Sequence, residues 1–366
     1  MKIGVLTSSR ADHGIYLPLL EKMKDDKRFH LEVIAFGMHL QKSQGNTIDQ
    51  ITKQGFDVIH KVGEMPESDG VIDISKGYGN IVLSFAEFWS QNKFDIVFAL
   101  GDRWEMSAAV QASIPFEVKI GHIHGGETTL GATDNIYRHQ ITLASTYHFT
   151  AAEVFSERVI SILGSDKNVY TVGSISLEDI DNLQLPSWDF VKEKFDIPFD
   201  DFILVTFHPE SVGASMNKRY TRVISKALKS LIKEHNILVT KANSDAMGSL
   251  FNDCFHLLQK EHPRKVKLVS ALGKMNYFKA MQNCTFMFGN TSSGIIEAAS
   301  FGKYVINVGD RQKGRLRNKN VKDVQWESEE ILMAINSIAE LGNYRCTNKY
   351  VTPGTTNAII DEILNK

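Results

Sequence analysis

Short β-branched runs alternate with longer amphipathic stretches along most of this chain of 366 residues. Such alternation is typical of βαβ units, in which parallel strands form a sheet and the connecting helices cover its faces. The rhythm pauses over a polar stretch, LEDIDNLQLPSWDF, and then begins again. Because single cores stop growing near about 250–300 residues, we expect two doubly wound α/β domains, joined near residues 175–190.

The expected strands are buried apolar runs, and the expected helices are the amphipathic stretches between or after them. The strands are Lys2–Thr7, Leu31–Phe36, Asp95–Leu100, Val118–Ile123, Tyr147–Thr150, Phe202–Phe207, Ile237–Lys241, Val266–Ser270, Thr285–Gly289 and Tyr304–Val308. The helices are Leu17–Lys27, Ile81–Asn92, Glu105–Ser113, Ile136–Ala144, Thr221–Glu234, Leu250–Gln259, Asn276–Met281, Ile295–Phe301, Ser328–Glu340 and Thr356–Lys366.

Charge and cysteine content restrict the classes of partner. The 41 Lys and Arg residues nearly balance 43 Asp and Glu, so no global cationic field indicates a nucleic-acid partner. No apolar run approaches the roughly 20 residues of a membrane span, and the N-terminus does not resemble a signal peptide, so we expect a cytoplasmic protein. The 3 cysteines lack CxxC spacing, which argues against a disulfide framework and a zinc site.

Polar residues that directly follow expected strands are the first candidates for a site, because ligands of open α/β sheets bind beyond the carboxyl ends of the strands. Ser8, Ser9 and Arg10 follow the first strand and could hold an anion near a helix N-terminus. The alternative is a plain helix cap with Arg10 as a solvated charge. Asp102 follows the strand DIVFAL, where a buried acid needs a partner. It could instead cap the helix that begins near Trp104.

The densest cluster is GHIHGGE with the Asp and Arg that follow it. The cluster places two imidazoles, two carboxylates and a guanidinium near one strand end, from His122, His124, Glu127, Asp134 and Arg138. Such packing shifts pKa values toward neutrality and suits acid–base chemistry. The HxH pair could indicate a metal, but no further ligand recurs at a familiar spacing. One of the two histidines could also be an ordinary core residue.

The second half of the chain adds a candidate anion site. Ser292, Ser293 and Gly294 follow a strand that ends in glycine, and a helix is expected to begin near Gly294. Its N-terminus and the serine hydroxyls could cradle a diphosphate, and Glu297 could bind both ribose hydroxyls. A serine-rich cap without a ligand is the alternative. Neither GxGxxG nor GxxxxGK[ST] occurs, so the dinucleotide and Walker fingerprints are missing.

Two further candidates in this half each have a structural alternative. His208 follows the strand that opens the second series and would face a ligand beyond the sheet edge, unless it only caps a helix. Arg315 lies in the cationic loop RQKGRLR, which is otherwise a solvated surface loop.

Taken together, the motifs of this chain resemble those of the hydrolysing UDP-N-acetylglucosamine 2-epimerase family. The resemblance is greatest to the branch that makes the mannosamine precursor of sialic and related nonulosonic acids. The motifs that carry it are SSRADHG, GDRWEM, GHIHGGE, GATDNIYRHQIT, TFHPES, GNTSSGIIEA and RQKGR. The resemblance implies a glycosyltransferase-B-like α/β fold with two Rossmann-like domains that face a cleft. Residues 1–178 would form the first domain and 190–350 the second, with the helix 355–366 docked back on the first.

The same resemblance implies the reaction and the residues that perform it. UDP-N-acetylglucosamine and water would give UDP and N-acetylmannosamine through a 2-acetamidoglucal, with no metal and no cofactor, in a homodimer or homotetramer. The implied catalytic residues are Asp102, Glu127, Asp134 and His208. The implied UDP-binding residues are Arg10, Ser292, Ser293, Gly294 and Glu297. His124, Arg138 and Arg315 are candidate substrate contacts.

One departure separates this chain from part of the family. Non-hydrolysing bacterial epimerases have glutamate where His124 stands, and here the glutamate is displaced to Glu127. This favours hydrolysis and leaves open which of the two residues takes the older role. The alternatives are the same chemistry on UDP-2,4-diacetamido-2,4,6-trideoxyglucose (the legionaminic acid route), a UDP-sugar-dependent glycosyltransferase of the same fold, and a nucleotide-sugar sensor without catalysis.

Overall fold

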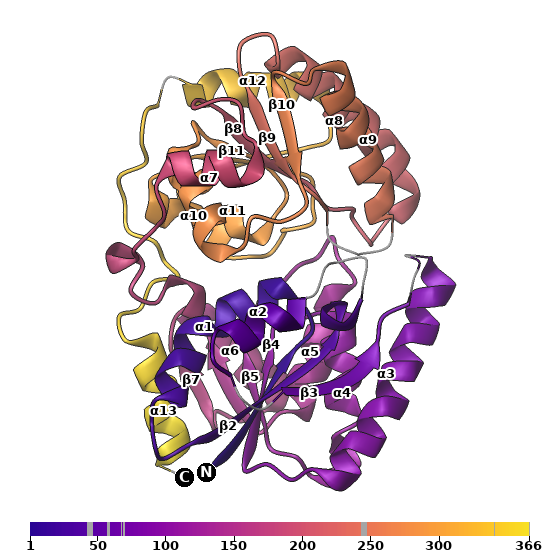
Figure 1. Ribbon diagram of the computed structural model, residues 1–366, viewed down its shortest axis with the longest axis vertical. Helices are drawn as coiled ribbons and strands as arrows, with labels where there is room; N and C mark the ends of the chain where they lie inside the picture. Colours follow the sequence, from indigo (N-terminus) through magenta and orange to yellow (C-terminus); the bar gives the residue numbers. More distant parts are fainter. Residues whose placement is uncertain are drawn as a thin grey trace. The chain divides into compact units, whose positions relative to one another are not determined.

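The computed structural model describes residues 1–41, 47–56, 59–66, 68, 70–242, 247–339 and 341–365. The chain divides into two compact units. The first unit consists of Met1–Glu127, Asp134–Asp179 and Tyr350–Lys366, and the second of Thr128–Thr133 and Ile180–Lys349. Each unit contains a parallel sheet covered by helices (Figure 1), so the predicted α/β class with two Rossmann-like domains is confirmed.

The first unit is built on a sheet of 7 strands in the order β3-β2-β1-β4-β5-β6-β7, with every pair parallel. The strands are β1 (Lys2–Thr7), β2 (His30–Gly37), β3 (Ile59–Glu64), β4 (Ile96–Leu100), β5 (Ile120–Ile123), β6 (Tyr147–Thr150) and β7 (Val169–Thr171). The chain order reverses beside β1, between β1 and β4. The carboxyl ends of β1, β4 and β5 therefore lie at adjacent positions of one edge, where doubly wound folds place their ligands.

Helices cover both faces of this first sheet. They are α1 (Arg10–Lys24), α2 (Thr47–Lys53), α3 (Val71–Gln91), α4 (Trp104–Gln111), α5 (Asp134–Ala144), α6 (Glu153–Leu163) and α13 (Thr355–Leu364). One core cluster joins α1, α2 and α13 to the sheet, and another joins α3, α4 and α5 to it. The helix α13 lies beside α1 (Figure 1) and buries Ile359, Ile360 and Ile363 in the first of these clusters.

The second unit has a sheet of 6 parallel strands in the order β10-β9-β8-β11-β12-β13. The strands are β8 (Ile203–Thr206), β9 (Ile237–Thr240), β10 (Val266–Val269), β11 (Met287–Gly289), β12 (Val305–Val308) and β13 (Val321–Val324). The helices are α7 (Trp188–Phe195), α8 (Asn217–Leu231), α9 (Gly248–Glu261), α10 (Lys274–Asn283), α11 (Ser292–Ile296) and α12 (Ser328–Ala339). The core on one face uses α8, α9 and α12, and the core on the other uses α7 and α10.

The structure departs from the predicted elements where tertiary packing outweighs the local pattern. The helix expected to begin at Leu17 begins at Arg10, because the Ser9 side chain accepts a hydrogen bond from the Asp12 N–H and Pro18 is tolerated inside the helix. The strands β3, β7 and β13 were not expected. β7 and β13 close one end of their sheets and are partly exposed, so they lack the apolar run that marks a central strand.

The polar pause between the two strand series contains a helix. The boundary between the two units, at Asp179 and Ile180, lies within the expected range 175–190. The helix α7 follows this boundary, where Ser187 caps it and its Trp188 and Val191 are buried in the core of the second unit. The predicted ends Glu340 and Lys366 of two helices lie outside the described residues. Among the residues that the structure describes, no helix is long and apolar enough to cross a membrane.

Candidate active site

His124 and Glu127 form a buried imidazole–carboxylate pair just beyond β5. The His124 backbone has a positive φ of 63°, which is uncommon for a residue other than glycine, and its N–H donates to the Phe149 carbonyl at 3.0 Å. The ring Nδ1 lies 2.6 Å from Glu127 Oε1. Both residues are almost fully buried. The turn therefore presents a fixed pair of groups that can share a proton.

Arg138 links this pair to Asp102. Its guanidinium is 1% exposed, forms an ion pair with Asp102, and donates to the His124 carbonyl oxygen at 2.7 Å. Asp102 does not cap α4, because the N-cap position is Arg103 and no side chain caps that helix end. Asp102, His124, Glu127 and Arg138 are thus one connected group in the first unit. Arg138, a candidate substrate contact in the sequence, directs its two terminal nitrogens to protein groups.

His122 is the core histidine of the HxH motif. Its Nε2 lies 2.8 Å from the Gly101 carbonyl oxygen and its Nδ1 lies 3.1 Å from Thr142 Oγ1. Complete burial lowers the pKa of His122 to about 3, so this side chain is neutral at physiological pH. Of the alternatives left open for the HxH pair, the structure supports the one in which a single histidine is a core residue, because His122 stays in the strand whereas His124 turns away from it.

The turn that carries Glu127 depends on Gly126. Its φ is 76°, and a Cβ at this position would overlap the Phe155 carbonyl oxygen. Arg158 on α6 donates to the Gly126 carbonyl at 2.6 Å. Close approach of two backbones and a positive φ both require glycine here, and together they fix the direction in which Glu127 leaves the turn.

The loop after β1 satisfies its polar groups internally. The Ser8 N–H and hydroxyl donate to Asp12 Oδ2 at 2.9 and 2.6 Å, and the Ser9 hydroxyl donates to Asp12 Oδ1 at 2.7 Å. The expectation that these small polar residues are available to an external anion is corrected, because Asp12 already occupies that position. Arg10 is the first residue of α1 and is half-buried.

A second buried carboxylate adjoins this loop and was not predicted. Glu105 is fully buried and forms an ion pair with Arg103, and its Oε1 lies 3.2 Å from the Ser8 hydroxyl oxygen. Burial raises the pKa of Glu105, and the Arg103 guanidinium opposes that shift. The signal in the sequence was the GDRWE run, in which a second acid closely follows Asp102.

In the second unit, His208 is held through its backbone by Asn290. The His208 N–H donates to Asn290 Oδ1 at 2.7 Å, and Asn290 Nδ2 donates to the His208 carbonyl at 2.8 Å. Gln312 donates to the Asn290 carbonyl at 2.9 Å. Asn290 therefore connects the turn after β8, the turn after β11 and the cationic loop. It was not predicted, although it directly follows a strand and precedes the serines.

The predicted diphosphate cradle is a short helix. α11 spans 5 residues and begins at Ser292 rather than near Gly294. The Ser293 hydroxyl lies 2.7 Å from the Tyr277 hydroxyl, and burial raises the pKa of Tyr277 to about 12. A Cβ on Gly294 would lie 2.9 Å from Val305 Cγ1, so this glycine allows the helix to pack on β12. Glu297 is buried directly after the helix.

The loop Thr128–Thr133 belongs to the second unit, although α5 after it belongs to the first. The Leu130 N–H donates to the Lys313 carbonyl at 3.0 Å, and a Cβ on Gly131 would overlap the Asp310 backbone. This loop therefore packs on the same cationic segment that carries Arg315, which is half-buried. Asp134 is the first residue of α5 and is half-buried too.

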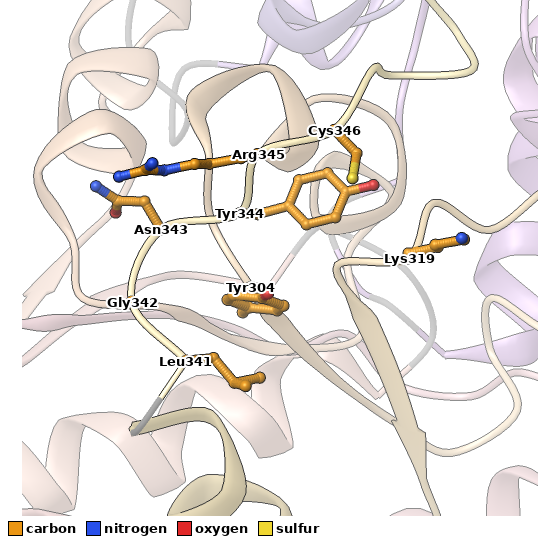
Figure 2. A pocket seen from close by; sticks show the side chains of 8 residues that line it. All are labelled: Tyr304, Lys319, Leu341, Gly342, Asn343, Tyr344, Arg345 and Cys346. Carbon is orange, nitrogen blue, oxygen red and sulfur yellow. The ribbon is translucent and has the colours of Figure 1, made fainter.

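A separate hollow of about 540 Å³ opens on the second unit (Figure 2). Its lining is Tyr304, Lys319, Leu341, Gly342, Asn343, Tyr344, Arg345 and Cys346. None of these residues was predicted for the site.

The comparison with known families decides the assignment that this geometry leaves open. The sequence pattern of the family described as UDP-N-acetylglucosamine 2-epimerase matches residues 21–364 of this chain. The chain belongs to the UDP-N-acetylglucosamine 2-epimerase family. This confirms the family that the motifs predict, and makes the chain an enzyme of nucleotide-sugar chemistry.

Two relatives and one solved structure show which proteins this chain is similar to. GDP/UDP-N,N′-diacetylbacillosamine 2-epimerase (hydrolyzing) from Campylobacter jejuni is 31% identical, over 88% of this chain and 84% of that protein. Polysialic acid biosynthesis protein P7 from Escherichia coli is 31% identical, over 92% of this chain and 85% of that protein. The crystal structure of UDP-GlcNAc 2-epimerase from Methanocaldococcus jannaschii, in complex with UDP-GlcNAc and UDP, matches with a TM-score of 0.81 at 14% identity and 100% coverage of both chains, which supports the fold.

Proposed function

We propose that this enzyme is a hydrolysing 2-epimerase that converts UDP-N-acetylglucosamine and water to UDP and N-acetylmannosamine. The observation that carries the proposal is the connected group in which Arg138 joins Asp102 to the His124–Glu127 pair. Two carboxylates and an imidazole, held in fixed orientations, suit a reaction that moves protons at neighbouring carbon atoms.

The proposed chemistry has two balanced steps. In the first, a base removes the C2 proton, the bond from C1 to the diphosphate oxygen breaks, and UDP leaves with that electron pair as the C1–C2 double bond forms. In the second, the oxygen of a water molecule bonds to C1 and the water gives one proton to a base, while an acid gives a proton to C2 on the face opposite to the one that lost the first proton, which inverts C2. C2 is weakly acidic, so the barrier falls chiefly by stabilising positive charge at C1 and negative charge on the departing UDP.

The side chains of the first unit are suited to the proton transfers. Glu127 lies at His124 Nδ1, and a carboxylate in that position fixes the tautomer and the orientation of the ring. Asp102, oriented by Arg138, provides negative charge for the electron-poor C1. Asp134 is the third proposed proton carrier. The family resemblance motivates these roles. The variants described in the Discussion test how the acid and base steps are divided among these residues.

Binding of the UDP portion of the substrate is assigned to other residues of the same family motifs. These are Arg10, Ser292, Ser293, Gly294 and Glu297, with His208 at the diphosphate and Arg315 as a further contact. The hydrogen bonds of Asn290 with both backbone groups of His208 support the assignment, because they fix the backbone from which the imidazole projects. The buried Glu297 carboxylate suits a pair of ribose hydroxyls.

A second sugar is favoured by one specific relative. The Campylobacter jejuni protein, 31% identical, is named for N,N′-diacetylbacillosamine, the sugar that is also 2,4-diacetamido-2,4,6-trideoxyglucose. The second candidate is therefore the same elimination and hydration on the UDP-linked form of that sugar, in the legionaminic acid route. The similarity to the polysialic acid biosynthesis protein favours the first candidate, with the product passing to sialic acid synthesis. A cytoplasmic homodimer or homotetramer is the proposed assembly.

The test is incubation of the protein with UDP-N-acetylglucosamine alone in D₂O. We expect free UDP and N-acetylmannosamine that carries deuterium at C2, because the original proton is lost and replaced. Product that keeps its C2 hydrogen would exclude the elimination route. Turnover that needs an added sugar acceptor would indicate a glycosyltransferase, and UDP-sugar binding without turnover would indicate a sensor. A parallel assay with UDP-N,N′-diacetylbacillosamine compares kcat/KM and decides between the sugars.

A further inference from the structure

Ser174 is the second partner of the His124 ring. Its Oγ lies 3.3 Å from His124 Nε2, while Glu127 Oε1 lies 2.6 Å from Nδ1. Ser174 is 1% exposed. Both nitrogens of the imidazole therefore have a fixed partner, and rotation or a flip of the ring would break both contacts at once. The identity of the group at one nitrogen governs which tautomer the ring adopts.

The Ser174 hydroxyl is itself oriented by a neighbour. Ser176 Oγ lies 3.0 Å from Ser174 Oγ, and Ser176 is also buried. A continuous row of hydrogen-bonded side chains therefore lies inside the first unit, from Glu127 through His124 and Ser174 to Ser176. Buried polar networks of this kind restrict each member to one orientation when they are satisfied.

The C-terminal segment of the chain holds Ser174 in place. The Ser174 N–H donates to the Tyr350 carbonyl at 2.9 Å, and the Thr355 hydroxyl donates to the Val172 carbonyl at 2.7 Å. Glu178 accepts from the Thr356 N–H at 3.1 Å and so caps α13. The segment around Ser174 is therefore fastened on both sides by residues that lie far away in the sequence.

We propose that Ser174 is a positioning residue, which holds the His124 imidazole through Nε2 in the orientation in which Nδ1 faces Glu127, so that the ring keeps the Glu127 carboxylate in place for proton transfer. The inference rests on the proposed function, since it assumes that Glu127 takes part in the proton transfers. It deepens that function by assigning the return of the C-terminal segment a task in the active site, namely to place the Ser174 hydroxyl.

The first experiment compares steady-state kinetics of Ser174→Ala and Ser174→Thr with the wild type. Because misplacement of a reacting group by about 1 Å can cost about 100-fold, we expect kcat of Ser174→Ala to fall about 10- to 100-fold, with KM and the Kd for UDP within about twofold. Ser174→Thr keeps a hydroxyl and should recover most of the loss. The matched control is Ser113→Ala, which removes another buried hydroxyl of the first unit, bonded to the Val110 carbonyl at the end of α4. It should leave kcat unchanged.

The deciding experiment is a double-mutant cycle with His124→Gln. If Ser174 acts through the His124 ring, Ser174→Ala should lower the residual kcat of the His124→Gln enzyme by less than about twofold, because the ring that it positions is gone. Losses that multiply in the double variant would overturn the proposal, as would an unchanged kcat in Ser174→Ala. Thermal unfolding midpoints of all variants are measured alongside, and a general loss of structure would appear there and in UDP binding.

The proposed function and this inference fail in different ways. If the wild type releases no deuterated sugar from either UDP-sugar, the proposed function is wrong and the role of Ser174 that rests on it is wrong too. If the wild type is active and the two substitutions are independent, the function stands and only the role of Ser174 is wrong.

Discussion

The side chain of Asn290 pairs with the backbone of His208 as a neighbouring strand would, accepting its N–H at 2.7 Å and donating to its carbonyl at 2.8 Å. Asn290 is fully buried. A single amide therefore continues the pairing of β8 and β11 beyond the last strand residue and fixes the direction of the His208 side chain. The relationship explains why the two motifs TFHPES and GNTSSG can act together although they lie far apart in the sequence.

Replacing Asn290 by Asp should test this relationship. The carboxylate can still accept from the His208 N–H, but it cannot donate to the His208 carbonyl, which would face a second oxygen. We expect unfolding to become easier by about 1–3 kcal/mol, the usual cost of a buried polar group left unsatisfied, and UDP binding to weaken. Urea denaturation and calorimetry measure the two effects. Asn236→Asp is the control, because this asparagine of the same unit is only half-buried and its Nδ2 donates to the Asp201 carbonyl at 2.8 Å. Equal destabilisation there would contradict the explanation.

Replacing the carboxylates of the first unit should lower the turnover rate without changing the affinity for the nucleotide. Asp102→Asn and Glu127→Gln keep the shape of each side chain and remove the ionisable group. We expect each to lower kcat by about 10²–10⁴-fold, the range of general acid–base catalysis, and kcat/KM in parallel, since the loss belongs to the transition state. The Kd for UDP, measured by calorimetry, should stay near that of the wild type. A large rise in Kd with normal kcat would place these residues at the nucleotide instead.

Glu297 should show the opposite behaviour. Its removal in Glu297→Ala deletes a buried acceptor that we assign to the ribose, so UDP affinity should fall by about 1–3 kcal/mol, the scale of hydrogen bonds to charged groups. Calorimetry with UDP and with 2′-deoxy-UDP gives a sharper comparison. The wild type should discriminate between the two ligands and the variant should not. If UDP affinity is unchanged in Glu297→Ala, the assignment of Glu297 to the ribose is wrong.

Three buried histidines should make the fold sensitive to mild acid. Burial lowers the pKa of His122 to about 3 and the pKa of His39 and His148 to about 4, whereas an unfolded histidine titrates near 6.5. The unfolded chain therefore binds more protons between these values. The resulting stability is fully present above pH 6.5 and is lost as the pH falls toward 4, by up to about 1.4 kcal/mol per pH unit for each histidine.

Glu105 and Glu210 act in the opposite sense, because burial raises the pKa of both carboxyl groups and the folded state then holds the proton at a higher pH than the unfolded state. A variant isolates the histidine effect. Urea unfolding of the wild type and of His148→Phe at pH 7 and at pH 5 should show a smaller loss of stability in the variant. An equal loss in both proteins would contradict the assignment of His148 as a neutral buried group.

The central parts of both sheets could be predicted from the sequence alone. The central residues of strands such as β1, β4 and β8 are buried on both faces, so these strands consist mainly of apolar residues and stand out from the helices around them. The edge strand β13 has two exposed charged residues, Lys322 and Asp323, at its centre. Its pattern matches that of a loop, and only its pairing with β12 makes it a strand.

The sequence by itself determined the family, the two strand series and the motifs at their ends, because polar residues after buried strands leave a local signal. Only the tertiary structure decided which of those residues act on one another. His122 and His124 are two positions apart and would lie on one side of a strand, but a positive φ turns His124 toward Glu127 and leaves His122 in the core. Ser174 became a partner of His124 through its hydrogen bond to Tyr350. Contacts of this kind join distant segments, and their energies depend on geometry that no local pattern encodes.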